Sequence, residues 1–355
     1  MSEITAVTVE ALDLPMEEPF EISLGTQREA ANVLVTVETA AGAVGYGEGA
    51  PIPPVTGETQ RAALATAEAM GDLVAGGEVT EYRSLVSEIR STFPGMASAA
   101  FAVETAVLDA YCREREIPLS ELFGGAPTPV TTDLTVPIVS ADEAYEQASR
   151  AAEDGFEHLK VKTGTDVASD VERVAAVAEG APDAHLKVDA NQGWTPKETA
   201  RFVEKLTARD VRLDLVEQPV PADDLAGLAQ VRDRVDVPVA ADESVFTPGD
   251  AMEVVRREAA DVINLKLGKS GPLAAADIVA VAEAANLDLM VGCMLESAIG
   301  IHTSAHVVSG TSAFSYVDLD GNLLLAEDVV DVNYGPTIEI GGPGHGIDPR
   351  DYIER

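Results

Sequence analysis

The chain has 355 residues, and its 61 acidic residues against 24 lysines and arginines give a formal net charge of −37. Because nucleic acids and anionic membrane surfaces attract basic proteins, this charge disfavours both as partners. Hydrophobic residues make up 46% of the chain, which is enough for a large folded core. The acidic residues are spread along the chain and lysine is scarce, so we infer a halophilic protein, since salt screens self-repulsion.

Cysteine usage and the distribution of apolar residues indicate the compartment. The two cysteines, Cys112 and Cys293, lie far apart and predict neither a disulfide framework nor a zinc site. The first residues lack the basic region and apolar run of a signal peptide. No uninterrupted apolar stretch reaches the roughly 18 residues that a membrane span needs. We therefore expect a cytoplasmic protein.

Residues 1–125 are predicted to form a mixed α+β unit. Segments 5–14 and 31–38 alternate in polarity like antiparallel strands, with a polar loop at 23–29 between them. A Gly- and Pro-rich stretch at 124–129 ends the unit. Helical periodicity appears in 58–74, 80–89 and 97–115.

From residue 131 onward, short apolar runs alternate with helical segments, mostly about 25 residues apart. The strand-like runs are 133–138, 158–162, 185–191, 213–218, 237–243, 262–267, 287–294 and 314–320, and helical segments include 141–153, 168–179, 196–208 and 272–285. This alternation predicts a parallel sheet closed into a (β/α) barrel over residues 126–325, with an open, doubly wound sheet as the alternative. The Gly- and Pro-rich tail, 326–355, is expected to return to the first unit.

Carboxylates stand at the ends of three successive predicted strands. Asp189, Glu217 and Asp242 lie within the last residues of the third, fourth and fifth runs, at spacings of 28 and 25 residues. Because the carboxyl ends of barrel strands meet at one face, these side chains should converge. Taken singly, each is also compatible with a helix cap or a solvated loop. Together, oxygen ligands without His or Cys predict a site for Mg²⁺, with Mn²⁺ as a possible substitute.

Three of the chain's seven lysines fall at strand ends near these carboxylates. Lys160 and Lys162 share one face of the second strand, and Lys266 ends the sixth. A charge-protected edge strand is the alternative explanation for the first two. A metal and the Lys160 ammonium group would lower the pKa of Lys162 toward that of a useful base. We therefore predict that Lys162 and Lys266 remove and return an α-proton on opposite faces of a metal-bound carboxylate, through an enediolate stabilised by Mg²⁺.

These residues lie in a set of motifs that resembles the enolase superfamily, muconate-lactonizing subgroup, over essentially the whole chain. The resemblance implies an α+β capping domain, formed by the N-terminal region and the C-terminal tail, over a modified (β/α)₇β barrel. The motifs are Lys160-x-Lys162, Asp189-Ala-Asn-Gln-Gly-Trp194, Glu217-Gln-Pro219, Ala241-Asp-Glu-Ser244 and Asn264-Leu-Lys-Leu-Gly-Lys269, together with Gly45-Tyr-Gly-Glu-Gly49 and residues 118–125 in the first unit.

Within the subgroup, Gly292-Cys-Met-Leu-Glu-Ser297 and Asp318-Leu-Asp-Gly-Asn322 look most like the dipeptide epimerases. In those enzymes the Asp-x-Asp pair holds the substrate's α-ammonium group, and its C-terminal carboxylate chelates Mg²⁺. The resemblance implies 1,1-proton transfer at the α-carbon of the C-terminal residue of a dipeptide. An acidic pair would attract a cation and repel a second carboxylate, which disfavours muconate cycloisomerase and o-succinylbenzoate synthase, the alternative activities. Asp318 and Asp320 are also compatible with a capping role at the barrel end.

Further residues follow from the same comparison. Thr135, Lys160 and Glu296 are expected to contact substrate beside Asp318 and Asp320. Asn191 and Glu243 are expected behind the metal ligands. A non-catalytic, metal-stabilised binding protein is a third possibility, and retention of the lysines and carboxylates disfavours it. Barrels of this type are often octameric or dimeric, so we expect a homo-oligomer.

Two further features concern substrate specificity and metal binding. Epimerases specific for Ala-Glu carry an arginine in the loop after the first strand, where this chain has Gly25, with Arg28 three residues away. A neutral or hydrophobic dipeptide is therefore equally admissible. His302 and His306 lie four residues apart without an accompanying carboxylate, so they are expected to be ordinary helix residues and not metal ligands.

Overall fold

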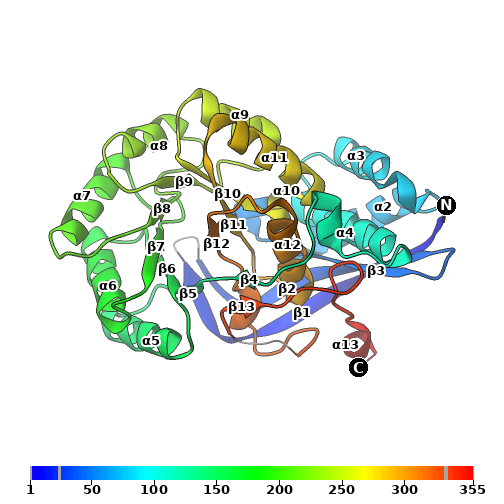
Figure 1. The fold of residues 1–355 in the computed structure, drawn as a ribbon, viewed down its shortest axis with the longest axis horizontal. Helices are drawn as coiled ribbons and strands as arrows, with labels where there is room; N and C mark the ends of the chain where they lie inside the picture. Colours follow the sequence, from blue (N-terminus) through cyan, green and yellow to red (C-terminus); the bar gives the residue numbers. More distant parts are fainter. Residues whose placement is uncertain (1, 23–24, 332–334, 355) are drawn as a thin grey trace.

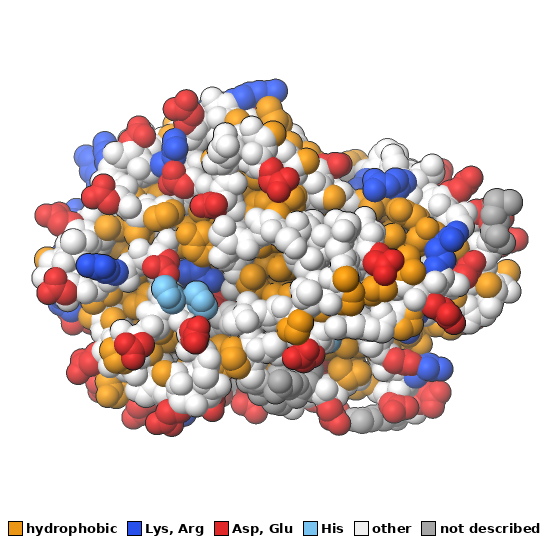
Figure 2. Space-filling view, in the orientation of Figure 1, with side chains coloured by type: hydrophobic (Ala, Val, Ile, Leu, Met, Phe, Trp, Pro, Cys, Tyr) orange, Lys and Arg blue, Asp and Glu red, His pale blue; other side chains and the backbone are white. Residues whose placement is uncertain are grey.

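The computed structural model describes residues 2–22, 25–331 and 335–354. An antiparallel sheet and its helices lie beside an eight-stranded parallel sheet that is surrounded by helices (Figure 1). Asp and Glu side chains are scattered across the face of the molecule in Figure 2. Within the described ranges, no helix is both long and apolar enough to cross a bilayer.

The first sheet has the order β1-β2-β3, formed by β1 (Ile4–Ile22), β2 (Gly25–Thr39) and β3 (Val44–Gly49). The β1–β2 hairpin is longer than predicted, because Phe20 still pairs with Gln27 after a register shift. The predicted loop at 23–29 is therefore wrong for residues 25–29, while residues 23 and 24 lie outside the described ranges. Where burial is described in this extension of the hairpin, at residues 15–19 and 25–29, most side chains are exposed, so the apolar alternation that marks a half-buried strand is missing.

Strand β3 lies directly against a buried helix because its alternate residues are glycines. The helices of this unit are α2 (Gln60–Val74), α3 (Tyr82–Thr92) and α4 (Ala97–Glu114). A Cβ atom on Gly45 would lie 2.3 Å from the Ala106 carbonyl oxygen, and one on Gly47 would lie 2.0 Å from that of Ala102. Any side chain at these positions would separate the two backbones, so the motif is a packing feature of this unit.

The parallel sheet runs in chain order from one end to the other, which confirms the predicted barrel-type α/β fold. Its strands are β5 (Leu134–Val136), β6 (His158–Lys162), β7 (His185–Asp189), β8 (Leu215–Glu217), β9 (Val239–Ala241), β10 (Val262–Lys266), β11 (Asp288–Gly292) and β12 (Tyr316–Val317). Figure 1 shows the connecting helices as an arc outside these strands. They are α5 (Ala141–Glu153), α6 (Val167–Gly180), α7 (Pro196–Thr207), α8 (Leu225–Arg232), α9 (Pro248–Arg256), α11 (Pro272–Ala285) and α12 (Ala298–Thr311).

Several strands are shorter than the apolar runs that predicted them. The eighth run, 314–320, keeps only Tyr316–Val317 as strand, and the fifth, 237–243, keeps Val239–Ala241. In both cases the residues lost at the carboxyl end carry buried acidic side chains, Asp318 and Asp320 or Asp242. The Asp318 backbone N–H still donates to the Val291 carbonyl oxygen at 2.9 Å, whereas Asp242 and Asp320 lie beyond the strand pairing. All three stand at the barrel mouth, where a site is expected.

The C-terminal segment contacts both parts of the molecule. Strand β13 (Thr337–Ile338) pairs antiparallel with β4 (Val130–Thr131), which precedes the barrel. Farther on, the backbone N–H of His345 donates to Asp109 of α4 at 2.9 Å. The remaining short elements are α1 (Pro53–Thr56), η1 (Val79–Glu81), η2 (Leu119–Phe123), α10 (Leu267–Ser270), η3 (Gly321–Leu324) and α13 (Arg350–Ile353).

Candidate active site

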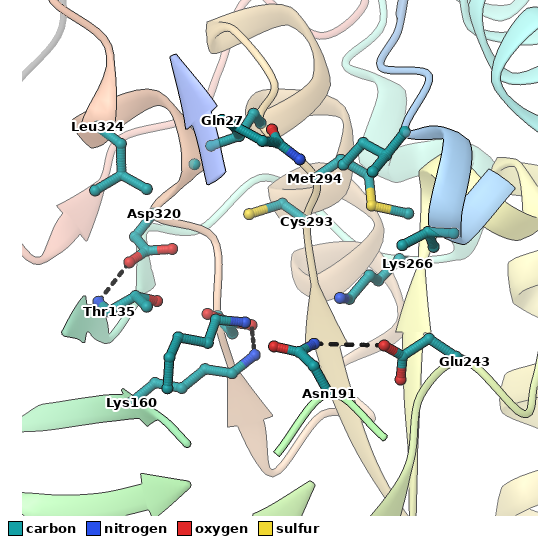
Figure 3. Close-up of a pocket in the computed structure, with 16 residues that line it drawn as sticks. Gln27, Thr135, Lys160, Asn191, Glu243, Lys266, Cys293, Met294, Asp320 and Leu324 are labelled. Carbon is teal, nitrogen blue, oxygen red and sulfur yellow. Dashed lines mark hydrogen bonds and ion pairs between the residues drawn. The ribbon is translucent and has the colours of Figure 1, made fainter. Parts of the chain in front are cut away.

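One pocket at the carboxyl ends of the barrel strands collects most of the predicted site residues (Figure 3). Its lining includes Thr135, Lys160, Lys162, Lys266, Asp318 and Asp320. Asn191 and Glu243 also line it, and the Asn191 amide donates to the Glu243 carboxylate at 3.4 Å. These residues come from strands or strand ends spread over more than 180 positions of sequence, so the barrel itself assembles the pocket.

The three carboxylates predicted to bind metal lie together behind the pocket. Asp189 and Glu217 are paired at the ends of β7 and β8, and Asp242 follows β9. All three are buried, and their ligand atoms lie within 4.8 Å of one another. An all-oxygen cluster of this kind suits a hard divalent cation, so the residues fit a metal site.

The two predicted bases reach this cluster from opposite sides of the barrel. Strand β10 lies four strands along from β6 in the sheet of eight. The Lys162 Nζ atom lies 2.7 Å from Asp189 Oδ2, and the Lys266 Nζ atom lies 2.7 Å from Asp242 Oδ2. Burial opposes the charge of Lys266, but Asp242 outweighs it and raises the pKa of Lys266 above its usual range.

Lys160 links the carboxylates of the pocket to each other. Its Nζ atom lies 2.6 Å from Asp318, 2.8 Å from Glu217 and 3.3 Å from Asp189. The side chain is only 2% exposed, and Figure 3 shows it on the opposite side of the pocket from Lys266. A buried ammonium group at the centre of three carboxylates fixes their relative positions.

The electrostatics of the cluster indicate an excess of negative charge. Burial, together with neighbouring Asp189, raises the pKa of Glu217 to about 8. Burial and Asp242 raise the pKa of Glu243 to about 7. Burial would also raise the pKa of Asp242, but Lys266 and Lys269 hold it below its ordinary value. The buried carboxylates therefore repel one another more than the neighbouring lysines compensate, and a bound cation would relieve this repulsion.

The predicted acidic pair lies at the other side of the pocket. Asp318 faces Lys160, whereas Asp320 Oδ2 accepts a hydrogen bond from the Thr135 backbone N–H at 2.6 Å (Figure 3). Burial and the charge of Asp318 raise the pKa of Asp320 to about 6. Two carboxylates held this close create a site that favours a cation.

The sequence did not single out three residues that hold two of the predicted metal-binding carboxylates, Glu217 and Asp242, in place. The Asn264 amide donates to Glu217 Oε1 at 2.6 Å, and the Lys269 ammonium group lies 2.6 Å from Asp242 Oδ1. The Gln218 side-chain oxygen accepts from the Asp242 backbone N–H at 2.8 Å. Asn264 stands two residues before Lys266, and the strand period could have placed it in the same interior.

Glu296, predicted to contact substrate, lies elsewhere. Among the described residues that line the pocket, Met294 and Leu295 are present and Glu296 is not. Its carboxylate is fully buried and accepts a hydrogen bond from the Met294 backbone N–H at 3.1 Å. Burial and the nearby Glu48 raise the pKa of Glu296 to about 8. Its position supports the loop that lines the pocket.

The candidate specificity residues fall on the β1–β2 hairpin. Gln27 lines the pocket, while the adjacent Arg28 is exposed. Consecutive strand residues point to opposite faces, so Arg28 cannot serve the pocket from this backbone position. The two histidines, His302 and His306, lie in α12, and His306 Nδ1 accepts from the Ser120 backbone N–H at 3.2 Å.

Both parts of the chain match a known family. Residues 4–124 match the mandelate racemase / muconate lactonizing enzyme N-terminal domain, and residues 143–353 match the enolase C-terminal domain-like family. The chain belongs to the enolase superfamily.

Individual superfamily relatives match over nearly the full length. The aromatic dipeptide epimerase of Herpetosiphon aurantiacus is 38% identical over 351 residues, 97% of this chain and 98% of that protein. The L-Ala-D/L-Glu epimerase of Bacillus subtilis is 36% identical, over 97% and 96%. The crystal structure of the Enterococcus faecalis dipeptide epimerase, complexed with Mg and the dipeptide L-Leu-L-Tyr, aligns with a TM-score of 0.93 at 35% identity, over 97% and 99%.

Proposed function

We propose that this superfamily member is a Mg²⁺-dependent dipeptide epimerase. Asp189, Glu217 and Asp242 would hold the cation, which would stabilise negative charge on the substrate carboxylate. Lys162 and Lys266 would exchange the α-proton. The observation that carries the proposal is the placement of these two lysines four strands apart, each 2.7 Å from a carboxylate of one buried cluster.

The charge of the pocket supports a zwitterionic substrate. Six carboxylates and four ammonium groups give a formal charge of −2, which one divalent cation would neutralise. A dipeptide zwitterion adds no net charge, whereas a dianion such as muconate would add two buried negative charges without partners. The groups are Asp189, Glu217, Asp242, Glu243, Asp318 and Asp320 with Lys160, Lys162, Lys266 and Lys269.

In this proposal, the substrate lies between the two charged ends of the pocket. Asp318 and Asp320 would bind the α-ammonium group, beside Thr135 and Lys160. Lys266 would exchange a proton with one face of the α-carbon, and Lys162 would serve the other face. Asn191 and Glu243 would orient the groups near Asp242.

The pocket wall supports a neutral or apolar substrate side chain. Ile52, Val55, Leu295 and Leu324 line the pocket with Gln27. Among its described lining residues, the only cations are Lys160, Lys162 and Lys266, and each lies within 2.8 Å of a carboxylate. An acidic side chain would therefore be buried without a partner, at a large cost.

The test is deuterium uptake by mass spectrometry, in D₂O with Mg²⁺ and molar KCl, over pooled L,L-dipeptides. We expect a one-dalton gain on dipeptides with apolar side chains and a much smaller gain on Leu-Glu. EDTA, Lys162→Ala and Lys266→Ala should abolish the gain, whereas Lys197→Ala, an exposed lysine on α7, should leave it unchanged. No gain on any dipeptide, with Mg²⁺ binding demonstrated, would instead favour the cycloisomerase or synthase chemistries.

We also propose that the acidic surface is an adaptation to high salt. Five of the seven lysines are buried inside the barrel, namely Lys160, Lys162, Lys187, Lys266 and Lys269. The solvent-facing surface therefore has even fewer lysines to balance its acidic groups than the composition suggests. Screening by salt would weaken the resulting repulsion.

A further inference from the structure

The two end strands of the parallel sheet, β5 and β12, meet beside the proposed ammonium site, and we call the region between them the barrel seam. Strands β5 and β12 are the two ends of the sheet order, and polar contacts join the residues around them. The Leu319 backbone N–H donates to Thr132 Oγ1 at 2.7 Å, and the Thr135 N–H donates to Asp320 at 2.6 Å. Asp320 therefore both joins the seam and lines the pocket, so its position depends on how the seam is held.

A buried ion pair reaches this seam from across the barrel. Lys187, on β7, extends its ammonium group to within 2.5 Å of Asp133 Oδ2 and donates to the Val317 carbonyl oxygen at 3.1 Å. Lys187 is 2% exposed and Asp133 is fully buried, and neither is among the described residues that line the pocket. Val317 immediately precedes Asp318, so the hydrogen bond from Lys187 fixes the backbone at the start of the Asp-x-Asp motif.

The buried Lys187–Asp133 ion pair carries a desolvation cost, because both charged groups are removed from water. The carboxylates of Asp133, Asp318 and Asp320 lie within 4.8 Å of one another, and burial raises the pKa of Asp133 well above its usual range. Apolar side chains of similar volume usually stabilise a core as well as a buried ion pair does. A positional role explains why a lysine and an acid occupy this seam in a chain with only seven lysines.

We propose that Lys187 and Asp133 are positioning residues that hold Asp318 and Asp320 in place for the substrate ammonium group. The pairing partner of Lys187 in the sheet register is Lys160, which contacts Asp318 from the pocket side at 2.6 Å. Two lysines thus hold the Asp-x-Asp segment. Lys160 contacts the Asp318 side chain from the pocket, and Lys187 binds the Val317 backbone carbonyl from outside the pocket. This inference rests on the proposed dipeptide substrate and deepens it, because it assigns selectivity for a free amino group to residues outside the pocket.

The test compares the binding of Leu-Leu and N-acetyl-Leu-Leu by calorimetry, with Mg²⁺ and molar KCl. The wild-type protein should prefer the free amine. Lys187→Met releases the Val317 carbonyl and leaves Asp133 without its cation, so the preference should fall roughly tenfold or more. Asp133→Asn, which keeps the side-chain volume and an acceptor, should lower it about threefold.

Controls separate positioning from general damage. Mg²⁺ affinity should stay close to wild type in both variants, since neither residue contacts the cluster of Asp189, Glu217 and Asp242. Arg90→Met removes the 2.7 Å partner of buried Glu104 in the first unit and should leave the preference unchanged. If Lys187→Met does not fold, the preference for Leu-Leu over N-acetyl-Leu-Leu in Asp133→Asn tests the positioning role.

The outcomes also separate this inference from the proposed function. Deuterium uptake by the wild-type protein tests epimerisation independently. An unchanged preference in the variants, with Mg²⁺ bound, overturns the positioning role even if the wild type epimerises. A wild-type protein that does not prefer the free amine overturns it as well.

Discussion

The buried Glu296 carboxyl group should make the stability of this protein depend on pH. Its Oε1 accepts one backbone hydrogen bond, from Met294, whereas neighbouring Glu48 accepts from Asn32 and Ser297. Glu48 has more donors to stabilise its charge, so Glu296 takes up the proton first. Replacing Glu296 by Gln imitates the protonated form at every pH.

The pKa shift sets the sign and the size of the effect. The pKa of Glu296 rises from 4.5 to about 8 through burial and the charge of Glu48. Between these values the folded protein binds a proton that the unfolded chain has lost, so stability falls as pH rises. At about 1.4 kcal/mol per unit, the loss across this window is on the order of 5 kcal/mol. Glu296→Gln should therefore match the wild type near pH 5 and exceed it by several kcal/mol above pH 8.

The assay is urea unfolding followed by circular dichroism, in molar KCl, at intervals from pH 5 to pH 9. The difference between variant and wild type removes the contributions of other titrating groups. Glu68→Gln, at an exposed position on α2, serves as the control and should track the wild type. A Glu296→Gln protein that is less stable than the wild type at pH 8.5 would refute the view that Glu296 is a protonated support of the pocket loop.

Three further predictions follow from individual contacts. Asn264→Leu removes the 2.6 Å hydrogen bond to Glu217, so calorimetry should give a Mg²⁺ affinity roughly ten to a hundredfold weaker; an unchanged affinity would contradict its orienting role. Gly47→Ala places a methyl group 2.0 Å from the Ala102 carbonyl oxygen and should lower the free energy of unfolding by about 1–3 kcal/mol or more. Gly42→Ala, which adds its methyl group in open space but at a φ of +84°, measures the cost of backbone strain without a steric clash. The thermal midpoint should rise between dilute buffer and molar KCl because of the net charge of −37, and a midpoint that does not change would argue against adaptation to salt.

The sequence alone determined the fold class and most of the pocket. Strand and helix periods repeat along residues 131–320, and a parallel sheet brings the carboxyl ends of its strands to one face. Lys162, Asp189, Glu217 and Lys266 stand at the last positions of their strands, so their convergence followed from the order of the strands without any knowledge of side-chain contacts.

The tertiary structure alone decided which acidic residues face the pocket and which support it. Asp320 and Glu296 each lie close beyond a strand end, yet Asp320 lines the pocket and Glu296 accepts a hydrogen bond from its own loop. The Lys187–Asp133 pair joins β7 to the seam, and nothing in its local sequence reveals the partner. Periodicity gives the face of an element on which a residue lies. Which buried charges become partners depends on barrel closure, which brings together residues far apart in sequence, and on the free energy cost of leaving a buried charge unpaired.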